Sequence, residues 1–282
     1  MRTVAEIGAV RRMVATARAR GLTVGFVPTM GFLHEGHLRL VDEARRRCGF
    51  VVMSVFVNPL QFGPGEDLTR YPRDAAGDQA KAAGRGVDLF FLPEEATMYG
   101  RSPSTTVVPA GLDRRWDGAI RPGHFVGVCT VVAKLFHIVQ PDVAVFGQKD
   151  VQQATIIRAM VRDLDFPVDV VISPTVREPD GLALSSRNSY LSPAERARAL
   201  VLWRALRAVA RAFDGGARAA PELEAVGRDV LNGEPDVRVD YFAIVSPTTL
   251  EPVEAAEPGC VVMVAARVGA TRLLDNLILG HA

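Results

Sequence analysis

Two histidines stand three residues apart where an apolar run gives way to an amphipathic pattern. His34 and His37 follow a predicted strand over 23–28 and a turn that ends at Gly31, and the apolar spacing over 34–47 predicts a helix. The first turn of such a helix presents unpaired N–H groups and the positive end of the helix dipole. Two imidazoles at this place can therefore bind phosphate or stabilise the charge on a leaving pyrophosphate.

Two other interpretations of the histidine pair remain open. Histidines at this spacing can bind a metal ion, but no cysteine or carboxylate nearby completes an obvious zinc set. The pair can also be ordinary surface residues, which the strand, glycine turn and helix around them make a weaker interpretation.

The composition is that of an ordinary globular protein. A chain of 282 residues is long for one hydrophobic core, so we expect two domains. The net charge of +1, from 33 basic and 32 acidic residues, gives no electrostatic reason to expect nucleic acid or an acidic membrane as a partner.

The cysteines and the apolar segments indicate a cytoplasmic protein. Cys48, Cys129 and Cys260 are odd in number and far apart, which fits small core residues in a reducing compartment. The N-terminus lacks the apolar segment of a signal peptide, and no run approaches the length of a membrane span.

Helices and strands alternate through residues 1–176. Helices are predicted over 3–20, 34–47, 74–84, 126–139 and 151–161, and strands over 23–28, 50–57, 87–92, 143–147 and 168–172, with a short extended segment at 104–108. Nearly continuous apolar strands are typical of a parallel sheet that is buried on both faces. We therefore expect an α/β fold with a Rossmann-like, doubly wound parallel sheet.

Residues 177–282 are expected to form a smaller α+β domain at the C-terminus. Ser192, Pro193 and Glu195 are typical of an N-cap, a first helical position and a capping box, so a helix should run from there to about Phe213. A weaker helix is predicted near 221–231, followed by extended segments at 236–246, 260–268 and 271–279.

Polar residues follow two further strands of the predicted sheet. Asn58 and Gln61 come after the second strand, and a turn with Lys149 and Asp150 follows the fourth. Ligands bind at the carboxyl ends of strands in open α/β sheets. Lys149 can meet a phosphate, Asp150 can cap the helix or accept a hydrogen bond from a ribose hydroxyl, and Gln153 shares their helix face. A plain turn after the second strand and a plain N-cap at Asp150 remain alternatives.

Three polar segments have less definite roles. Ser185, Ser186 and Arg187 can clamp the phosphates of a nucleotide, although such a turn is also common on surfaces. The loop 64–73 is polar enough to be a mobile cover. The arginine- and glycine-rich stretch 114–125 can bind an anion, form a solvated loop or contact another subunit.

The order of these motifs resembles that of one enzyme family. His34, Glu35, Gly36 and His37, with 185–187 far downstream, are similar to the HIGH and KMSKS-like motif pair of the nucleotidyltransferase superfamily. Within it, further segments resemble the pantoate–β-alanine ligase (pantothenate synthetase) family, namely 28–31, 56–59, 61–62, 71–73, 146–150, 152–153 and 184–188.

The resemblance implies the ATP-dependent condensation of (R)-pantoate with β-alanine to (R)-pantothenate. The pantoate carboxylate would attack the α-phosphorus of Mg-ATP with release of pyrophosphate, and the amine of β-alanine would displace AMP from the pantoyl adenylate. It also implies a homodimer formed through the N-terminal domain and closure of the C-terminal domain over ATP, with 177–187 as the hinge. No protein ligand to magnesium is assigned.

The same resemblance implies roles for individual residues. His37 would be the proton donor, with His34 and Lys149 as the other catalytic residues. Pantoate would bind Gln61, Gln153 and Asn58, and β-alanine would bind Gln61. The residues expected to contact ATP are Met30, Gly31, Phe32, Leu33, His34, Glu35, Gly36, His37, Gly147, Gln148, Lys149, Asp150, Val176, Leu184, Ser185, Ser186 and Arg187.

Two other functions remain as alternatives. A nucleotidyltransferase of the same fold would share both phosphate motifs, but it does not explain Gln61 and Gln153 together, and it would leave a stable nucleotidyl product instead of AMP. A non-catalytic adenine-nucleotide sensor would not need His34, His37 and Lys149 all together.

Overall fold

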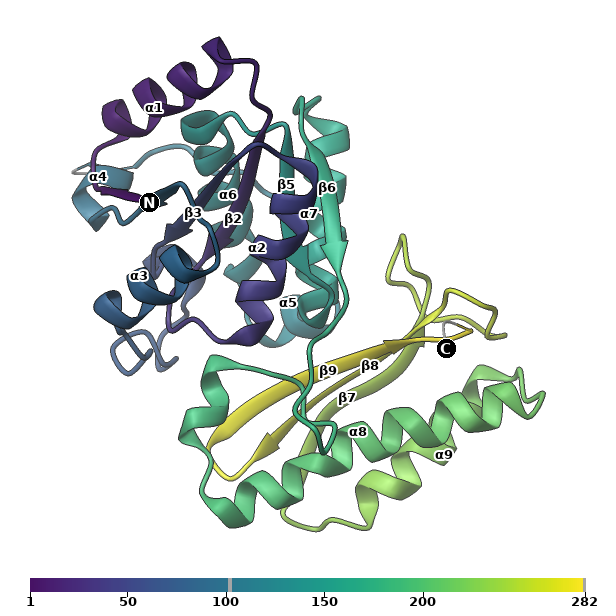
Figure 1. Ribbon diagram of the computed structural model, residues 1–282. Coiled ribbons are helices and arrows are strands. Elements are labelled where there is room, and N and C mark those ends of the chain that lie inside the picture. The colour runs from purple at the N-terminus through teal and green to yellow at the C-terminus, as the bar shows by residue number, and fades with distance from the viewer. Residues whose placement is uncertain (101–102, 281–282) are drawn as a thin grey trace. The chain divides into compact units, whose positions relative to one another are not determined.

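The computed structural model describes residues 1–100 and 103–280, which fold into two compact units (Figure 1). The first unit consists of Met1–Gly147 and Ile156–Pro174, and the second consists of Gln148–Thr155 and the chain from Thr175 onward. The chain therefore passes from one unit to the other three times, after 147, 155 and 174.

A six-stranded parallel sheet forms the centre of the first unit. Its order is β1-β4-β3-β2-β5-β6, and all its pairings are parallel. The strands are β1 (Arg2–Val4), β2 (Val24–Thr29), β3 (Phe50–Val55), β4 (Leu89–Phe91), β5 (Val143–Gly147) and β6 (Asp169–Ser173). This confirms the expected doubly wound sheet.

Helices cover both faces of the larger sheet (Figure 1). The helices as far as residue 163 are α1 (Ile7–Ala19), α2 (Glu35–Arg47), α3 (Ala75–Gly84), α4 (Glu95–Tyr99), α5 (Trp116–Ile120), α6 (His124–Val139) and α7 (Val151–Asp163). One apolar core joins α1, α6 and the end of α7 to one face of the sheet, and another joins α2 and α3 to the opposite face. Phe26 lies in the first core and the next residue, Val27, in the second, as alternation along a strand requires.

The N-terminal helix expected over 3–20 is shorter than predicted. Arg2–Val4 form the edge strand β1, which pairs with β4, and α1 begins only at Ile7. The valine at position 4 and the isoleucine three residues later fit a helical period, so periodicity could not exclude a helix there. Residues 104–108 form no strand, although the N–H of Val107 donates to Thr130 Oγ1 at 3.0 Å.

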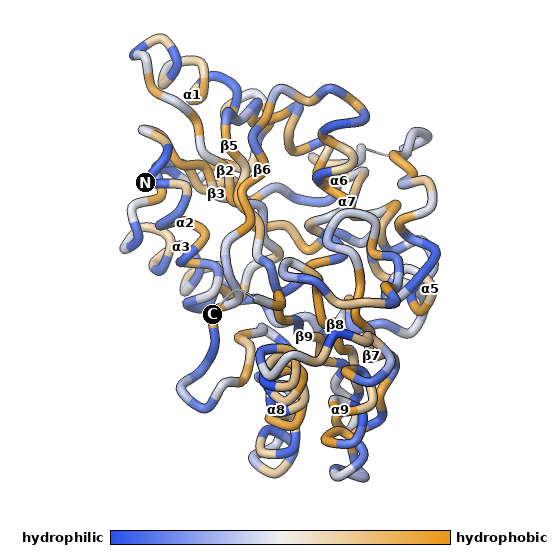
Figure 2. Tube along the Cα trace, turned by 90° about the vertical axis from the view of Figure 1, so that its right-hand side faces the viewer, coloured by the Kyte–Doolittle hydropathy of each residue, from blue (hydrophilic) through white to orange (hydrophobic). Residues whose placement is uncertain are grey.

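The second unit contains a three-stranded antiparallel sheet and two long helices. The sheet order is β7-β8-β9, from β7 (Val237–Val245), β8 (Val261–Val268) and β9 (Thr271–Ile278), with α8 (Pro193–Asp214) and α9 (Ala220–Asn232). Ser192 caps α8 and forms the predicted capping box with Glu195. In Figure 2, α8 alternates between hydrophobic and hydrophilic residues. This is because only one side of the helix packs against the three-stranded sheet to form the core of this unit.

Within the described part of the chain, three short 3₁₀ helices and the cysteines complete the description. The 3₁₀ helices are η1 (Pro59–Gln61), η2 (Gln148–Asp150) and η3 (Ser186–Tyr190). All three cysteines are buried and unpaired, as their spacing predicted. Among the described residues, no helix combines the length and the apolar character needed to cross a membrane.

Candidate active site

The expected ligand-binding edge of the larger sheet lies where its winding reverses. From β2 the chain proceeds outward through β3 and β4, whereas from β5 it proceeds in the other direction to β6. The two central strands are neighbours, since Gly25 pairs with Val143 and Phe26 with Ala144. Ligands bind outside the carboxyl ends of strands at such a switch point. The segments that follow β2, β3 and β5 are therefore the first place to look for a site.

The two histidines form the start of α2 together. His34 is the N-cap, one residue before the helix, and not a member of the first turn as the spacing alone implied. Its Nδ1 accepts from the N–H of Gly36 at 3.1 Å, while Nδ1 of His37 accepts from the N–H of His34 at 3.3 Å. The ring centroids are 4.1 Å apart. Because both Nδ1 atoms accept, each neutral ring carries its proton on Nε2.

A buried carboxylate holds the turn that leads to these histidines. Asp78, on α3, is only 1% exposed and accepts hydrogen bonds from the N–H groups of Phe32 at 2.8 Å and Leu33 at 2.6 Å. Lys81, one turn later, donates to the carbonyl of Leu33 at 2.8 Å. The turn needs such support because Phe32 has a left-handed φ of 51°, which is unfavourable for a bulky side chain.

Sequence reasoning missed Asp78, and the glycine before Phe32 shows how tightly the turn fits. Gly31 has a φ of 87°, and a Cβ there would lie 2.8 Å from Val55 and 2.9 Å from the Asp78 carboxylate. In the sequence, Asp78 is an acidic residue in the first turn of a helix, which is common for dipole reasons alone. No pattern distinguishes it from a surface charge.

Asn58 and Gln61 lie together at η1. The amide of Asn58, 1% exposed, donates to Gln61 Oε1 at 3.0 Å and to the Gly127 carbonyl at 3.1 Å, while Tyr99 donates its hydroxyl proton to Asn58 Oδ1. Burial raises the pKa of Tyr99, so this hydroxyl stays a donor. Gln61 Nε2 in turn contacts Met30 Sδ at 3.3 Å. The structure thus brings the predicted pantoate residues of the first unit beside the predicted ATP turn.

The stretch 114–125, whose role the sequence left undecided, contains side chains that donate hydrogen bonds to the backbone carbonyl of Gln61. His124 donates from Nδ1 to the Gln61 carbonyl at 2.7 Å, and its Nε2 accepts from Arg121 at 3.0 Å. Arg121 also donates to both oxygens of Glu66, at 2.8 and 2.6 Å, and to the Gln61 carbonyl at 3.3 Å. These residues therefore anchor η1 and the beginning of the 64–73 loop to α6.

Gly127 allows the same helix to approach η1 closely. A Cβ at this position would lie 2.2 Å from the carbonyl oxygen of Leu60 and 2.6 Å from the N atom of Gln61, both backbone atoms. Only glycine leaves the room that this packing requires.

The state of His124 gives a prediction for acid stability. Burial, together with the positive charge of Arg121, lowers the pKa of His124 to about 4, while the hydrogen bonds of Arg121 keep the pKa of Glu66 low despite its burial. The unfolded chain takes up a proton at this histidine near pH 6.5, before the folded chain does. The free energy of unfolding should therefore fall by up to about 3 kcal/mol between pH 6.5 and pH 4.

The measurement compares urea unfolding of the wild type and His124→Asn across this pH range. Asparagine can still donate to the Gln61 carbonyl but does not titrate, so the variant should lose most of the pH dependence between 6.5 and 4.5. Equal slopes for both proteins would contradict the assignment of a neutral His124.

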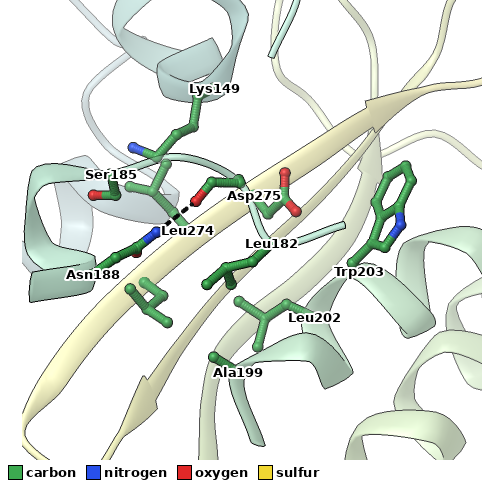
Figure 3. A pocket seen from close by; sticks show the side chains of 11 residues that line it. Lys149, Leu182, Ser185, Asn188, Ala199, Leu202, Trp203, Leu274 and Asp275 are labelled. Carbon is green, nitrogen blue, oxygen red and sulfur yellow. Dashed lines mark hydrogen bonds between the residues drawn. The ribbon is translucent and has the colours of Figure 1, made fainter. Parts of the chain in front are cut away.

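Apart from Gly147, the other predicted ATP residues lie in the second unit. One small pocket is lined by Lys149, Ser185, Asn188 and Asp275, among others. In Figure 3, Lys149, Ser185 and Asn188 lie near Leu274. The Lys149 ammonium group is 3.7 Å from the Asp150 carboxylate, which is nearly half exposed.

Nearby backbone groups are ordered by local hydrogen bonds. The N–H of Leu184 donates to the Val176 carbonyl at 3.0 Å, and Ser185 caps η3 by accepting from the N–H of Arg187 at 3.3 Å. Ser186 is buried. Gln153 lies on α7, one turn after Lys149.

Two observations concern ligands directly. A Cβ at Gly147, the last residue of β5, would meet nothing within 4 Å, so the strand end is open to close approach. Among residues 1–100 and 103–280, no group of three or more His, Cys, Asp or Glu side chains could hold a metal ion.

Comparison with known proteins identifies the family. The family model described as pantoate-beta-alanine ligase matches residues 2–278. A pantothenate synthetase of Moorella thermoacetica is 51% identical over 279 residues, which span 99% of either chain. The chain belongs to the pantoate–β-alanine ligase family. This confirms both the resemblance and the expectation of a ligase.

Further members of the family agree in sequence and fold. A pantothenate synthetase of Acidobacterium capsulatum is 54% identical over 287 residues, covering 99% of this chain and 96% of the relative. The crystal structure of pantothenate synthetase from Thermus thermophilus has a TM-score of 0.94 at 52% identity and 99% coverage of both chains. The Francisella tularensis ligase, solved in complex with "Beta-gamma ATP and Beta-alanine", has a TM-score of 0.80 at 29% identity, covering 99% of this chain and 97% of that one.

Proposed function

We propose that this chain condenses (R)-pantoate with β-alanine in an ATP-dependent reaction that gives (R)-pantothenate, AMP and pyrophosphate. The observation that carries the proposal is the imidazole pair at the start of α2, where His34 and His37 each accept at Nδ1 and carry a proton on Nε2. Two neutral donors at a helix N-terminus suit the phosphates of ATP. Membership of a family whose Francisella member was solved with a form of ATP and β-alanine supports the substrates.

In the first step, a carboxylate oxygen of pantoate attacks the α-phosphorus of ATP as the bond to the bridging oxygen breaks and pyrophosphate leaves. We propose that the Nε2–H groups of His34 and His37 donate hydrogen bonds to the phosphate oxygens, with His37 at the position that the family resemblance assigns to the proton donor, and that Lys149 adds a positive charge. No covalent bond to the protein is needed, so the protein contributes positioning and charge stabilisation.

In the second step, the amine of β-alanine attacks the acyl carbon of pantoyl adenylate, the bond to AMP breaks and the amine loses a proton. We propose that Gln61 and Gln153 bind the hydroxyls and carboxylate of pantoate, with Asn58 in support and Gln61 also near β-alanine. The Asn58 hydrogen bond to Gln61 supports this division of roles. Neutral amides bind a polyol without competing as nucleophiles.

The remaining contacts to ATP are proposed from the same motifs. The turn 30–33 and residues 34–37 would line the nucleotide, Gly147 and Asp150 would meet the ribose, and 184–187 would bind the triphosphate, with Gln148 and the Val176 backbone nearby. The open space at Gly147 and the pocket shared by Lys149 and Ser185 support these placements. We propose that magnesium enters as its complex with ATP, where it would neutralise phosphate charge, since it prefers phosphate oxygens and water to protein cages.

We also propose the organisation of the working protein. Residues 1–176 would bind ATP and pantoate, and 177–282 would close over ATP.

A homodimer through the first of these domains is supported by exposed apolar side chains there, including Val108 and Ile120 at 63% and 40% exposure, and sedimentation would test it. A cytoplasmic location is supported by three buried, unpaired cysteines, and cell fractionation would test it.

The direct test is product release from Mg-ATP. We expect continuous formation of AMP and pyrophosphate in equal amounts only when pantoate and β-alanine are both present, whereas pantoate alone should release no more than a single turnover of pyrophosphate. An equal rate of pyrophosphate release with and without pantoate would contradict the proposal. A stable nucleotidyl product in place of AMP would point to a nucleotidyltransferase. Binding of ATP with no turnover at all would favour a sensor.

A further inference from the structure

One buried side chain on β9 holds the turn that carries Lys149. Asn276 is 1% exposed, and its Nδ2 donates to the carbonyl oxygens of Gln148 and Lys149, each at 2.9 Å. Its Oδ1 accepts from Gln148 Nε2 at 3.0 Å. A single amide thus makes three hydrogen bonds to η2, a helix of three residues, and all of these groups lie within the second compact unit.

Asn276 is itself fixed by a buried ion pair. Arg177 donates to both carboxylate oxygens of Asp275, at 2.6 and 2.8 Å, and to the Asn276 carbonyl at 3.2 Å. The Arg177 guanidinium lies 3.6 Å from the centre of the Trp203 ring, and Asp275 Oδ1 accepts from the N–H of Asn276 at 2.7 Å. A bidentate pair stacked on an aromatic ring leaves the strand little freedom at this point.

We call the hydrogen bonds that join Asn276 to Gln148 and Lys149 the clamp, and they determine the position of the Lys149 backbone. The carbonyls that Asn276 binds belong to Lys149 and to the residue before it, so they fix the peptide groups on both sides of the Lys149 Cα atom. In Figure 3 the Lys149 side chain lies beside the strand that carries Asp275. We propose that Asn276 is a positioning residue for the nucleotide, which holds η2 so that Lys149 and Asp150 face ATP. This rests on the proposed function, because it assigns those two residues to ATP.

Aspartate at position 276 provides the sharpest test. Asn276→Asp keeps the size and shape of the side chain but replaces the donor by an acceptor that faces two carbonyl oxygens. We expect the Kd for ATP, measured by titration without pantoate, to rise about tenfold because two hydrogen bonds to η2 are lost. The KM for ATP should rise in parallel.

A matched control separates positioning from general loss of stability. Asp240→Asn disrupts another partly buried ion pair of the same sheet, in which Arg272 donates to Asp240 at 2.7 Å. This variant should lower the melting temperature without changing the Kd for ATP, whereas Asn276→Asp should raise the Kd even where both proteins are fully folded. An equal change of Kd in the two variants would overturn the proposal, and so would wild-type affinity in Asn276→Asp.

A double variant tests the route through Lys149. If Asn276 acts by placing this lysine, Asn276→Asp should weaken ATP binding far less in a Lys149→Ala background than in the wild type. If Asn276→Asp raised the Kd for ATP by the same factor in both backgrounds, Asn276 would not act through Lys149. The wild-type product assay is independent of these titrations, so a failure of the ligase assignment is distinguishable from a failure of the clamp.

Discussion

Replacing His37 by glutamate should slow adenylate formation severely while the start of α2 stays intact, and replacing it by glutamine should preserve more of the activity. His37 occupies the third position of the helix and accepts from the N–H of the N-cap residue. Glutamate and glutamine are the usual residues at this position of a capping box, so either can keep that hydrogen bond. They differ at the outer end of the side chain, where only glutamine offers a neutral donor.

The expected loss for His37→Glu is about 10³-fold in the rate of pyrophosphate release, and for His37→Gln about ten- to a hundredfold, since one donor to a developing charge contributes about 10²–10³. Single-turnover release of pyrophosphate from Mg-ATP and pantoate measures this step, and thermal unfolding shows that the helix start has survived. If both variants were as active as the wild type, His37 would only cap the helix.

Asp78→Asn should disrupt the turn at 30–33 and should therefore lower both the free energy of unfolding and kcat/KM for ATP. The carboxylate accepts two buried backbone N–H groups with its two oxygens. An asparagine has one oxygen, so either orientation places its NH₂ group against an N–H. An unsatisfied buried donor costs about 1–3 kcal/mol, so we expect the free energy of unfolding to fall by about 2–4 kcal/mol. We expect kcat/KM for ATP to fall about a hundredfold, because misplacing a substrate-positioning element can cost that much.

Asp74 offers the matched control on the same helix. It is exposed and caps α3 by accepting from the N–H of Gly77 at 2.9 Å. Asparagine caps a helix as well as aspartate does, so Asp74→Asn should change the free energy of unfolding by less than about 0.5 kcal/mol. Urea unfolding and ATP kinetics on both variants provide the comparison. Similar small effects for the two substitutions would contradict the role of Asp78.

The sequence predicted the larger sheet and its ligand-binding edge because buried parallel strands and their glycine turns have strong local signatures. His34, His37 and Gln61 were predicted as site residues in this way, since each lies in the segment that follows such a strand. The edge strand β1 was missed because three residues are too few for periodicity to separate a strand from a helix start.

The supporting residues could not be predicted because their partners are distant in the sequence. Asp78 contacts residues 45 and 46 positions earlier, and His124 contacts a carbonyl 63 positions earlier. Asn276 is a polar residue in an otherwise ordinary strand, and nothing local marks it. Residues that bind a ligand are indicated by the strand before them, whereas residues that hold those residues are revealed only by the fold.

The three crossings of the chain between the two units bear on how such a protein can evolve. A domain joined by a single linker can be gained, lost or exchanged as a module. Here the segment 148–155 groups with the C-terminal unit although both of its sequence neighbours belong to the other, and Asn276 binds it across 128 residues of sequence. A fragment that began at residue 177 would lack this segment. Recombination that replaced the C-terminal part of the gene would separate the amide from its turn, so we expect the two to be inherited together.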